Sequence, residues 1–584
     1  MKTLNKIVLL VCMIAGSLLP VAASAQLTDG VFPAVGTPGN PKVDATWNHY
    51  YDYQGITELT EKIADAHPDL VKRSSIGKSY EGREMWMLTI TNYKKGDADK
   101  KPAMYIDGNI HSNEIQGTEV ALYTAWYLTE AFGEIDFITE LLNDKTFYII
   151  PTISPDAREH FMKKPNNPNS PRAGMVPIDN DGDGEVDEDG YDDLDGDGNI
   201  TFMIRKNPRG DYRIDPEYPD RLVRVGPDEF GEYELLGYEG LDNDGDGRIN
   251  EDGVAFSYDP NRDWGWNWQP DYIQRGAYKY PFSLPEMRNI KDFAMKHPNI
   301  AAAQTYHNRG GMILRGPGAE EDRGTYTRED VRVYDAIGEK GERLIPGYNY
   351  FVVFDDLYTV FGGELDWFYG IRGVFTYSNE LFTNFEMYNT DDEPGRRGFD
   401  EVYNEFNRDL LFGDGLVKWS SYDHPQYGKI MIGGAKKGYT RAHPGFLLEQ
   451  MAHRNMAFTL FHAYHTPKLV IDEITEKDLG GGLKEVTAVI TNERMIPTHA
   501  GIDLDYNITR PNYISIKGAD VEAGMIVNNR DLNQTTEQKN NPAILRVRNI
   551  PGMSSVTVRW IISGGKRYSI MVDSAKGGVV TKKK

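Results

Sequence analysis

The segment His111-Ser112-Asn113-Glu114 holds the residues of this chain whose types and spacing are best suited to chemistry. It is the one place where a glutamate follows a histidine by three residues. An imidazole and a carboxylate at that spacing can bind one zinc ion together, and a catalytic zinc needs a third protein ligand and keeps its fourth position for water. Taken alone, His111 and Glu114 could equally be ordinary loop residues. A metal site is indicated only if further ligands are found elsewhere in the chain.

The elements around this pair place it at the end of a strand. Residues 103–107 are predicted to form a buried strand, Gly108-Asn109 a turn and residues 117–132 a helix. Open α/β sheets usually place their ligands at the C-terminal ends of strands. The pattern therefore favours a site where the 103–107 strand ends.

A third ligand is available where a second apolar strand, residues 300–306, ends at His307. A histidine in that position is more often a core residue, but beside the first pair it is the best remaining candidate. Three other histidines lie on or just after a predicted helix, residues 446–464, and are interpreted as structural: His453, His462 and His465.

The length and the N-terminus suggest an exported protein of more than one domain. A chain of 584 residues exceeds one ordinary core. Lys2 and Lys6 precede an apolar run, residues 7–21, and Ala23-Ser24-Ala25 ends it. We expect residues 1–25 to be a signal peptide and the protein to be secreted or periplasmic, without a spanning helix.

Cysteine and charge narrow the chemistry further. The single cysteine, Cys12, lies in the signal segment, so any zinc must be held by histidine and carboxylate rather than thiolate. The formal charge of -24 argues against nucleic acid or an anionic membrane as a partner. The sequence does not indicate an oligomeric state.

An acidic insertion, about residues 165–255, interrupts the α/β pattern with two near-identical repeats, residues 179–190 and 242–253, and a shorter version at 193–198. Oxygen ligands at alternate positions with glycine at the sixth are typical of calcium loops. The twelfth position is glycine rather than glutamate, which argues against an EF-hand, and a solvated acidic loop is the alternative. The tentative calcium ligands are Asp179, Asp181, Asp183, Asp187, Asp193, Asp195, Asp197, Asp242, Asp244, Asp246 and Asn250.

After Pro467 the pattern changes to short alternating strands, including residues 484–491, 502–508 and 555–562. This predicts a small all-β sandwich over 467–584, in which no group of residues suggests a catalytic or metal site. The catalytic domain would then occupy residues 26–466.

Five segments together resemble the zinc metallocarboxypeptidases of the carboxypeptidase A type, and the likeness is spread over most of residues 46–465. They are Asn109–Ile115, Asp259–Trp264, Gln304–Asn308, Tyr358–Trp367 and Thr376–Leu381. The resemblance implies a mixed, twisted sheet flanked by helices, and zinc held by His111, Glu114 and His307.

The resemblance also implies roles around the metal. Glu380 ends a strand and would act as general base and then acid. Asn261 and Arg262 would bind the substrate's terminal carboxylate, for which the arginine offers a planar fork. Tyr358 would close over the substrate, with a buried structural tyrosine as the alternative. Leu365 would favour an apolar or aromatic C-terminal residue, although Glu364 beside it weighs against this.

The arginine that stabilises the oxyanion in this family is assigned to Arg205, with Arg209 or Arg213 as alternatives. The sequence thus predicts a zinc carboxypeptidase acting on peptides or proteins with a free C-terminal carboxylate, with calcium in the insertion. Two alternatives remain: a zinc peptidase acting on bacterial cell-wall peptides, and a non-catalytic, calcium-ordered surface binding protein.

Overall fold

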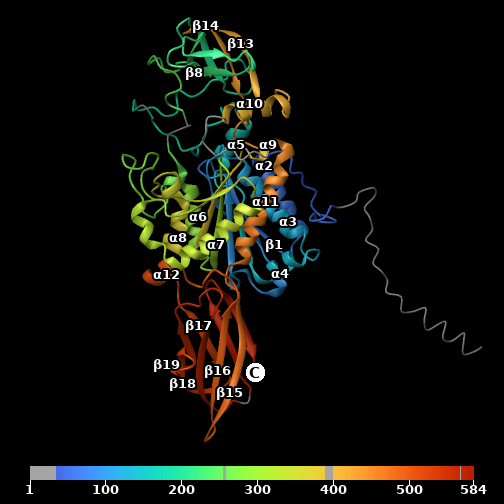
Figure 1. The fold of residues 1–584 in the computed structure, drawn as a ribbon, viewed down its shortest axis with the longest axis vertical. Coiled ribbons are helices and arrows are strands. Elements are labelled where there is room, and N and C mark those ends of the chain that lie inside the picture. Colours follow the sequence, from blue (N-terminus) through green and yellow to red (C-terminus); the bar gives the residue numbers. More distant parts are fainter. Residues whose placement is uncertain (1–33, 181, 254–257, 384, 389–398, 566) are drawn as a thin grey trace, which may run out of the picture.

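The computed structural model describes residues 34–180, 182–253, 258–383, 385–388, 399–565 and 567–584. Figure 1 shows three regions stacked along the long axis, with the α/β region in the middle. The predicted signal peptide lies outside the described residues. Within the described part of the chain, no helix has both the length and the apolar character needed to cross a membrane.

The α/β region is built on a mixed, eight-stranded sheet in the order β1-β2-β4-β3-β9-β12-β10-β11. Its four inner strands β4, β3, β9 and β12 run parallel. Strands β1 and β2 pair antiparallel with their neighbours, and β10 pairs antiparallel with β12 and parallel with β11. The predicted mixed sheet is confirmed. Its strands are β1 (Val71–Lys78), β2 (Glu84–Ile90), β3 (Ala103–Gly108), β4 (Thr146–Ile150), β9 (Ile300–Asn308), β10 (Met312–Arg315), β11 (Asn349–Val352) and β12 (Phe375–Leu381).

Helices cover both faces of this sheet, and each face has its own apolar core. One core takes residues from α2 (Tyr53–Ala66), α3 (Gln116–Glu130), α4 (Asp136–Asp144), α7 (Arg328–Leu344) and α11 (Gly445–Tyr464). The other takes residues from α6 (Pro285–Lys296) and α8 (Glu364–Arg372). All nine residues of β9 are buried because both faces are covered, as is usual for parallel strands.

The shorter elements of this region connect the larger ones. They are α5 (Pro155–Lys163), α9 (Phe385–Tyr388), α10 (Phe399–Asp409), the π-helical turn η5 (Val353–Leu357) and the 3₁₀ turns η1 (Tyr93–Lys95), η2 (Ala98–Lys100), η3 (Pro260–Arg262) and η4 (Glu320–Thr325).

The acidic insertion contains regular secondary structure, which its content of Asp, Gly and Pro did not predict. It contributes four strands to a six-stranded antiparallel sheet at the upper end of the molecule. Two further strands arrive from a hairpin nearly two hundred residues later, which the sequence analysis had assigned to the α/β pattern. The sheet order is β13-β14-β5-β8-β6-β7, with β5 (Phe202–Lys206), β6 (Tyr212–Ile214), β7 (Leu222–Arg224), β8 (Tyr233–Tyr238), β13 (Leu416–His424) and β14 (Gly428–Ala435).

The C-terminal region is an all-β sandwich, as predicted, whose five- and four-stranded sheets share one core. The strand expected at 502–508 is wrong, because that segment forms the helix α12 (Gly501–Tyr506), whose Ile502 packs into the α/β core. The sandwich strands are β15 (Leu469–Gly480), β16 (Leu483–Asn492), β17 (Asn512–Lys517), β18 (Asp520–Asn529), β19 (Gln534–Glu537), β20 (Ile544–Val547), β21 (Ser554–Ser563), β22 (Ser569–Ser574) and β23 (Gly578–Lys583).

Candidate metal centre and active site

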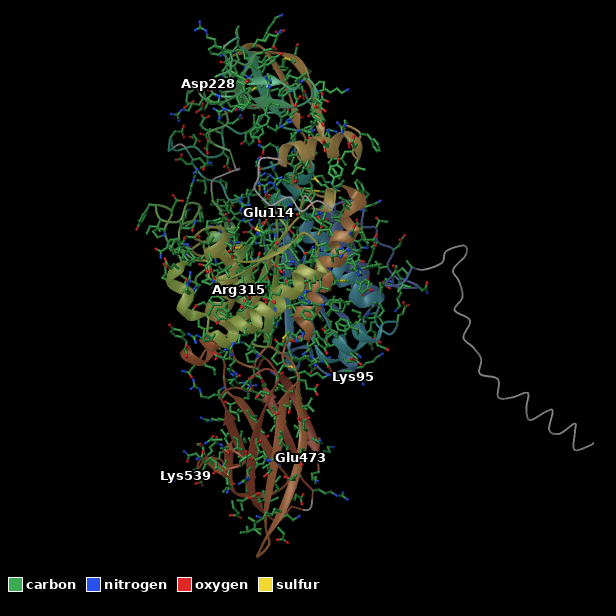
Figure 2. The ribbon with its side chains drawn as sticks, viewed as in Figure 1. Lys95, Glu114, Asp228, Arg315, Glu473 and Lys539 are labelled. Atoms are coloured by element: carbon green, nitrogen blue, oxygen red, sulfur yellow. The ribbon has the colours of Figure 1, made fainter. Side chains whose placement is uncertain are left out.

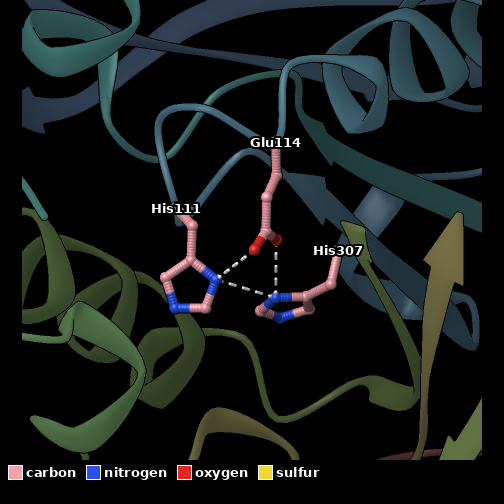
Figure 3. A group of neighbouring side chains, drawn as sticks. All are labelled: His111, Glu114 and His307. Carbon is pink, nitrogen blue, oxygen red and sulfur yellow. Dashed lines mark hydrogen bonds and ion pairs between the residues drawn. The ribbon is translucent and has the colours of Figure 1, made fainter. Parts of the chain in front are cut away.

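The three predicted zinc ligands meet at one point in the central region (Figures 2 and 3). His111 Nδ1 lies 3.0 Å from one oxygen of Glu114, and His307 Nδ1 lies 3.2 Å from the other. The two Nδ1 atoms are 3.2 Å apart. All three side chains are buried. Two imidazoles and a carboxylate therefore face one another in a space shielded from water.

This arrangement fits a zinc ion. Donor atoms bound to a tetrahedral zinc at 2.0–2.1 Å lie about 3.3 Å from one another, which matches the observed separations. Two histidines and a glutamate leave a fourth position free, which is the donor set of a catalytic rather than a structural site. Although burial alone would raise the pKa of Glu114, the charges of His111 and Arg172 hold it well below its usual range, so the carboxylate is ready to bind a cation.

A carboxylate outside this ligand set orients His111. Asp259 Oδ1 lies 2.8 Å from His111 Nε2. A proton on Nε2 leaves the lone pair of Nδ1 free to face the metal, which is the usual role of a carboxylate behind a histidine ligand. The sequence analysis named Asp259 only as part of a motif. The residue could not have been assigned this role from spacing, because 148 positions separate it from His111.

Glu380 lies beside the metal centre, at the end of β12. Strand β12 runs parallel to β9, and Glu380 pairs in register with His307. Both side chains line the cavity that also contains His111. Burial and the nearby charge of Glu114 raise the pKa of Glu380 to about 7. The structure therefore brings the predicted base to the metal centre.

Asn261 and Arg262 line the same cavity. They form part of the short turn η3, which begins after Asp259, whose side chain accepts the Asn261 backbone N–H. Arg262 is 8% exposed, and its Nε has no hydrogen-bond partner among the described residues. A buried guanidinium with a free donor is suited to bind an incoming carboxylate.

The structure does not place Arg205 at this site. Arg205 lies on β5 of the upper sheet, where its guanidinium is paired with Glu234 at 2.5 Å. The two alternatives, Arg209 and Arg213, belong to the same sheet region, and Arg213 is paired with Glu229. The prediction that one of these three arginines reaches the metal centre is wrong, because this part of the insertion folds into the upper sheet.

Arg172 occupies the position that sequence reasoning had given to Arg205. Its Nη1 lies 2.6 Å from Glu114 and its Nη2 lies 3.4 Å from Asp259, and it lines the cavity with Glu380. The sequence offered one weak signal: Arg172 precedes the first acidic repeat, so it is outside the segment that loops away.

The two remaining predicted substrate residues are also at the cavity. Tyr358 follows the turn η5 and is 58% exposed, with its backbone N–H bonded to Val353. Its exposure argues against the alternative of a buried structural tyrosine. Leu365 is buried in the first turn of α8 and lines the interior. Both residues thus line the cavity.

The acidic loops form groups of carboxylates that are separate from the metal centre. Asp179 and Asp242 each fold their own loop by accepting two backbone N–H groups of the glycines that follow. Four groups of acidic side chains are close enough to share a cation: Asp183 with Glu188 and Asp244, Asp189 with Asp244 and Glu251, Asp193 with Asp195 and Asp197, and Asp242 with Asp244 and Asp246. Asp181 lies outside the described residues.

The two long repeats are coupled by reciprocal contacts. Asp252 of the second repeat accepts the backbone N–H groups of Asn180 and Asp187, and Asp189 of the first accepts those of Asn243 and Asn250. The ninth residue of the first repeat, Asp187, belongs to none of the acidic groups in the described chain, and the ninth residue of the second, Asn250, is not acidic. The structure brings in their neighbours Glu188 and Glu251 instead.

Comparison with known proteins was consistent with this geometry. The family model described as zinc carboxypeptidase matches residues 56–176 and 217–392, just over half of the chain. A second model, described as a domain of unknown function, matches residues 468–584. The unmatched stretch between the two zinc carboxypeptidase segments contains the first long repeat and β5.

Similar proteins include a zinc carboxypeptidase of Saccharothrix mutabilis subsp. capreolus, 31% identical over 25% of this chain and 34% of that protein. Carboxypeptidase B of Astacus astacus is 26% identical over 57% of this chain and 87% of that protein. Thus the chain spans about a third of the former and most of the latter. Among solved structures, carboxypeptidase A from Helicoverpa armigera has 17% identity and a TM-score of 0.42, covering 72% of this chain and 76% of that one.

Proposed function

Because the chain belongs to the zinc carboxypeptidase family, we propose that it hydrolyses the C-terminal peptide bond of peptides or proteins with a free terminal carboxylate. The observation that carries this proposal is the common cavity lined by the two histidine ligands, by Glu380 and by the Asn261-Arg262 pair. A base beside a metal would suit many hydrolases. An arginine with an unused donor beside them restricts the substrate to one that ends in a carboxylate.

Each side chain has a task in this reaction. When bound by His111, Glu114 and His307, zinc supplies an acidified water and an electrophile for the scissile carbonyl. Glu380 accepts the proton of the attacking water and returns it to the leaving amine. Arg172 donates to the oxygen on which negative charge develops, a task that this proposal transfers from Arg205.

The remaining groups bind and enclose the substrate. Asn261 and Arg262 hold the terminal carboxylate and so fix the distance from the chain end to the metal centre. Tyr358, at the exposed mouth, closes over the bound peptide and excludes water.

Amino-acid release by the zinc-loaded protein from peptides, read by mass spectrometry of the shortened C-termini, tests the function. We expect Glu380→Gln to retain zinc and to lose at least about 100-fold in kcat, in the range of general acid–base catalysis. Equal rates for wild type and variant would indicate a non-catalytic binding protein. Matched peptides ending in L- and D-residues decide between ordinary peptides and bacterial cell-wall peptides as substrates.

We also propose that calcium binds the acidic loops. Both carboxylate oxygens of Glu188 and of Glu251 lack a hydrogen-bond donor among the described residues. Contact with Asp252 and partial burial raise the pKa of Glu188 to about 7, and burial and contact with Asp189 raise that of Glu251 to about 7. A calcium ion shared by these carboxylates would relieve the repulsion between them and would link the two repeats.

Metal add-back tests calcium binding without disturbing the zinc site. The protein is stripped of metal and then supplied with zinc alone, zinc with calcium, or zinc with magnesium. We expect a higher melting temperature with calcium than in the other two samples, and a smaller increase in Glu188→Gln/Glu251→Gln. Identical melting curves in all three samples would leave the loops as solvated acidic segments.

Export from the cell is the last part of the proposal. It rests on the basic and apolar residues at 2–21 and the small residues that follow them. N-terminal sequencing of the protein from its native host should find Gln26 first. A chain that still begins at Met1 would contradict export by this signal.

A further inference from the structure

The cavity at the metal centre continues past the carboxylate-binding pair into a pocket at the start of α8. With the substrate carboxylate at Asn261 and Arg262 and the scissile bond at the metal centre, the side chain of the last residue has to enter this pocket. The inference drawn here therefore rests on the proposed function. The lining residues of the pocket are Thr305, Leu314, Glu364, Leu365, Asp366 and Ser378.

Two of these lining residues are buried acids, and they differ in the hydrogen bonds that their carboxylates accept. Asp366 accepts the Gly318 backbone N–H at 2.9 Å and the Tyr326 hydroxyl at 3.2 Å. Glu364 is 1% exposed, and neither of its carboxylate oxygens has a hydrogen-bond donor within the described chain. Glu364 is thus a buried acid whose oxygens receive no hydrogen bond within the described chain.

A second buried acid, Asp107, lies against Glu364. Asp107, near the end of β3, contacts Glu364 and has an oxygen that also lacks a partner among the described residues. Burial and the charge of Asp107 raise the pKa of Glu364 well above its usual range, and burial raises that of Asp107 to about 6. Two carboxyl groups in contact require a shared proton or a cation.

No cation of the described protein fulfils this need. Arg172 and Arg262 lie nearer the metal centre, where they contact Glu114 and Asp259. Arg315 follows the pocket residue Leu314 on β10, but its guanidinium bonds to Tyr350 and Gly316.

We propose that Glu364, supported by Asp107, is the residue that selects the substrate, and that it selects peptides ending in lysine or arginine. The cationic end of such a side chain would supply the donors that the two acids lack. An apolar side chain would cover both acids without donating to either, so the pair would keep only its shared proton and gain nothing from the bound substrate. The expectation that Leu365 favours an apolar or aromatic residue is replaced by this proposal, with Leu365 packing against the aliphatic stem.

Two peptides that differ only in the last residue, lysine or norleucine, test the role of Glu364, because the two side chains have the same carbon chain and differ in the ammonium group. We expect wild type to favour lysine in kcat/KM by about 10- to 100-fold, the range of a charge-assisted hydrogen bond. Glu364→Gln should bring this ratio close to one, mainly by loss of activity on the lysine peptide.

Glu286→Gln is the matched control, because Glu286 is a buried acid on α6 that accepts the Tyr80 backbone N–H outside the pocket. It should keep the wild-type ratio. A preference of wild type for norleucine, or a ratio unchanged by Glu364→Gln, would overturn the inference. Cleavage of neither peptide would instead contradict the proposed function.

A second measurement covers the case in which Glu364→Gln does not fold. Free L-lysine and L-norleucine are compared as competitive inhibitors of wild type with one fixed substrate. Lysine should inhibit at about 10-fold lower concentration or better, by the same charge-assisted contact. Equal inhibition would overturn the proposal without any variant.

Discussion

At the scale of single residues, the active site depends on charges balanced by specific partners. Arg172 bridges Glu114 and Asp259, and Asp259 in turn orients His111. A single arginine thus contacts both a metal ligand and the carboxylate that orients another ligand. Arg205, which has the same side chain, is paired with Glu234 in another sheet and contacts none of these groups.

The two arginines make a matched pair of variants. Arg172→Gln should lower kcat by about 100- to 1,000-fold, the usual loss when one donor to an oxyanion is removed. Arg205→Gln should leave kcat and KM within about 2-fold of wild type, since a surface ion pair of this kind contributes little. Steady-state kinetics on one peptide, with zinc content measured for each variant, checks both. A comparable loss in Arg205→Gln would restore the original assignment.

The buried pair of Asp107 and Glu364 should also make stability depend on pH. In the folded state the pKa of Asp107 is raised to about 6 and that of Glu364 is raised further, from unfolded values near 4. The folded protein therefore holds more protons than the unfolded chain between these values. The contribution of the pair to stability is present at about pH 4 and is lost as pH rises through 6.

Glu364→Gln should remove the part of this dependence that comes from Glu364 and leave the part that comes from the burial of Asp107. Relative to wild type, the metal-free variant should gain stability as pH rises from 4.5 to 7.5, because it lacks the carboxyl group whose pKa burial and Asp107 raise. The measurement is the difference in melting temperature between the two proteins across this range. A difference that does not change with pH would show that the two carboxyls are not coupled in the folded protein.

At the scale of secondary-structure elements, the site forms where three adjacent parallel strands end. Strands β3, β9 and β12 are neighbours in the sheet and deliver His111, His307 and Glu380. Glu114 is added by the turn between β3 and α3. Because parallel strands all end at the same sheet edge, residues far apart in sequence meet there.

A close backbone contact sets the position of α3 against this edge. A Cβ atom on Gly108 would lie 2.6 Å from the carbonyl carbon of Gly117, and one on Gly117 would lie 3.0 Å from the Cβ of Tyr306. Only glycine lets the start of α3 approach β3 and β9 so closely. The intervening loop carries both His111 and Glu114, so the position of two ligands depends on this contact.

Gly108→Ala should therefore weaken metal binding without touching a ligand. We expect a zinc dissociation constant at least about 10-fold higher, as for other changes outside the ligand set, and a stability loss of about 1–3 kcal/mol from overpacking. A chelator competition assay and thermal melting measure the two effects. Gly324→Ala, where a Cβ would meet open space, is the control and should change neither. Wild-type zinc affinity in Gly108→Ala would contradict this account.

At the scale of the whole molecule, the sandwich is joined to the α/β region by buried polar contacts (Figure 1). Lys576, between β22 and β23, donates to the backbone carbonyls of Arg372 and Gly373 and to Asp503 of α12 at 2.7–2.8 Å. The Lys576 and Asp503 side chains are 2% and 0% exposed. Lys145 of the α/β region donates to the carbonyls of Thr466 and Pro467, where the chain enters the sandwich.

Lys576→Met should destabilise the whole chain. It leaves Asp503 as a buried charge without its partner, which typically costs about 3–5 kcal/mol. We expect a lower melting temperature and faster proteolysis near residues 465–468. Lys539→Met, on the outer surface of the sandwich (Figure 2), should have no effect on either readout. An unchanged melting temperature in Lys576→Met would mean that the two regions unfold independently of this contact.

The sequence by itself determined the donor chemistry and the local elements. The spacing of His111 and Glu114, the strand before His307 and the absence of cysteine from residues 26–584 specified a histidine and carboxylate metal centre. Strands and helices that are rich in apolar residues, such as β3, β9, α3 and α11, were predicted close to their observed bounds. These features depend on neighbours along the chain, which a sequence records directly.

Only the tertiary structure decided which distant charges meet. It replaced Arg205 with Arg172, paired Asp107 with Glu364, brought Asp259 to His111 and completed the upper sheet with β13 and β14. Such pairings are set by how strands order themselves in a sheet and by where an insertion folds back. Neither depends on sequence separation, so counting residues across residues 165–255 could not reveal them.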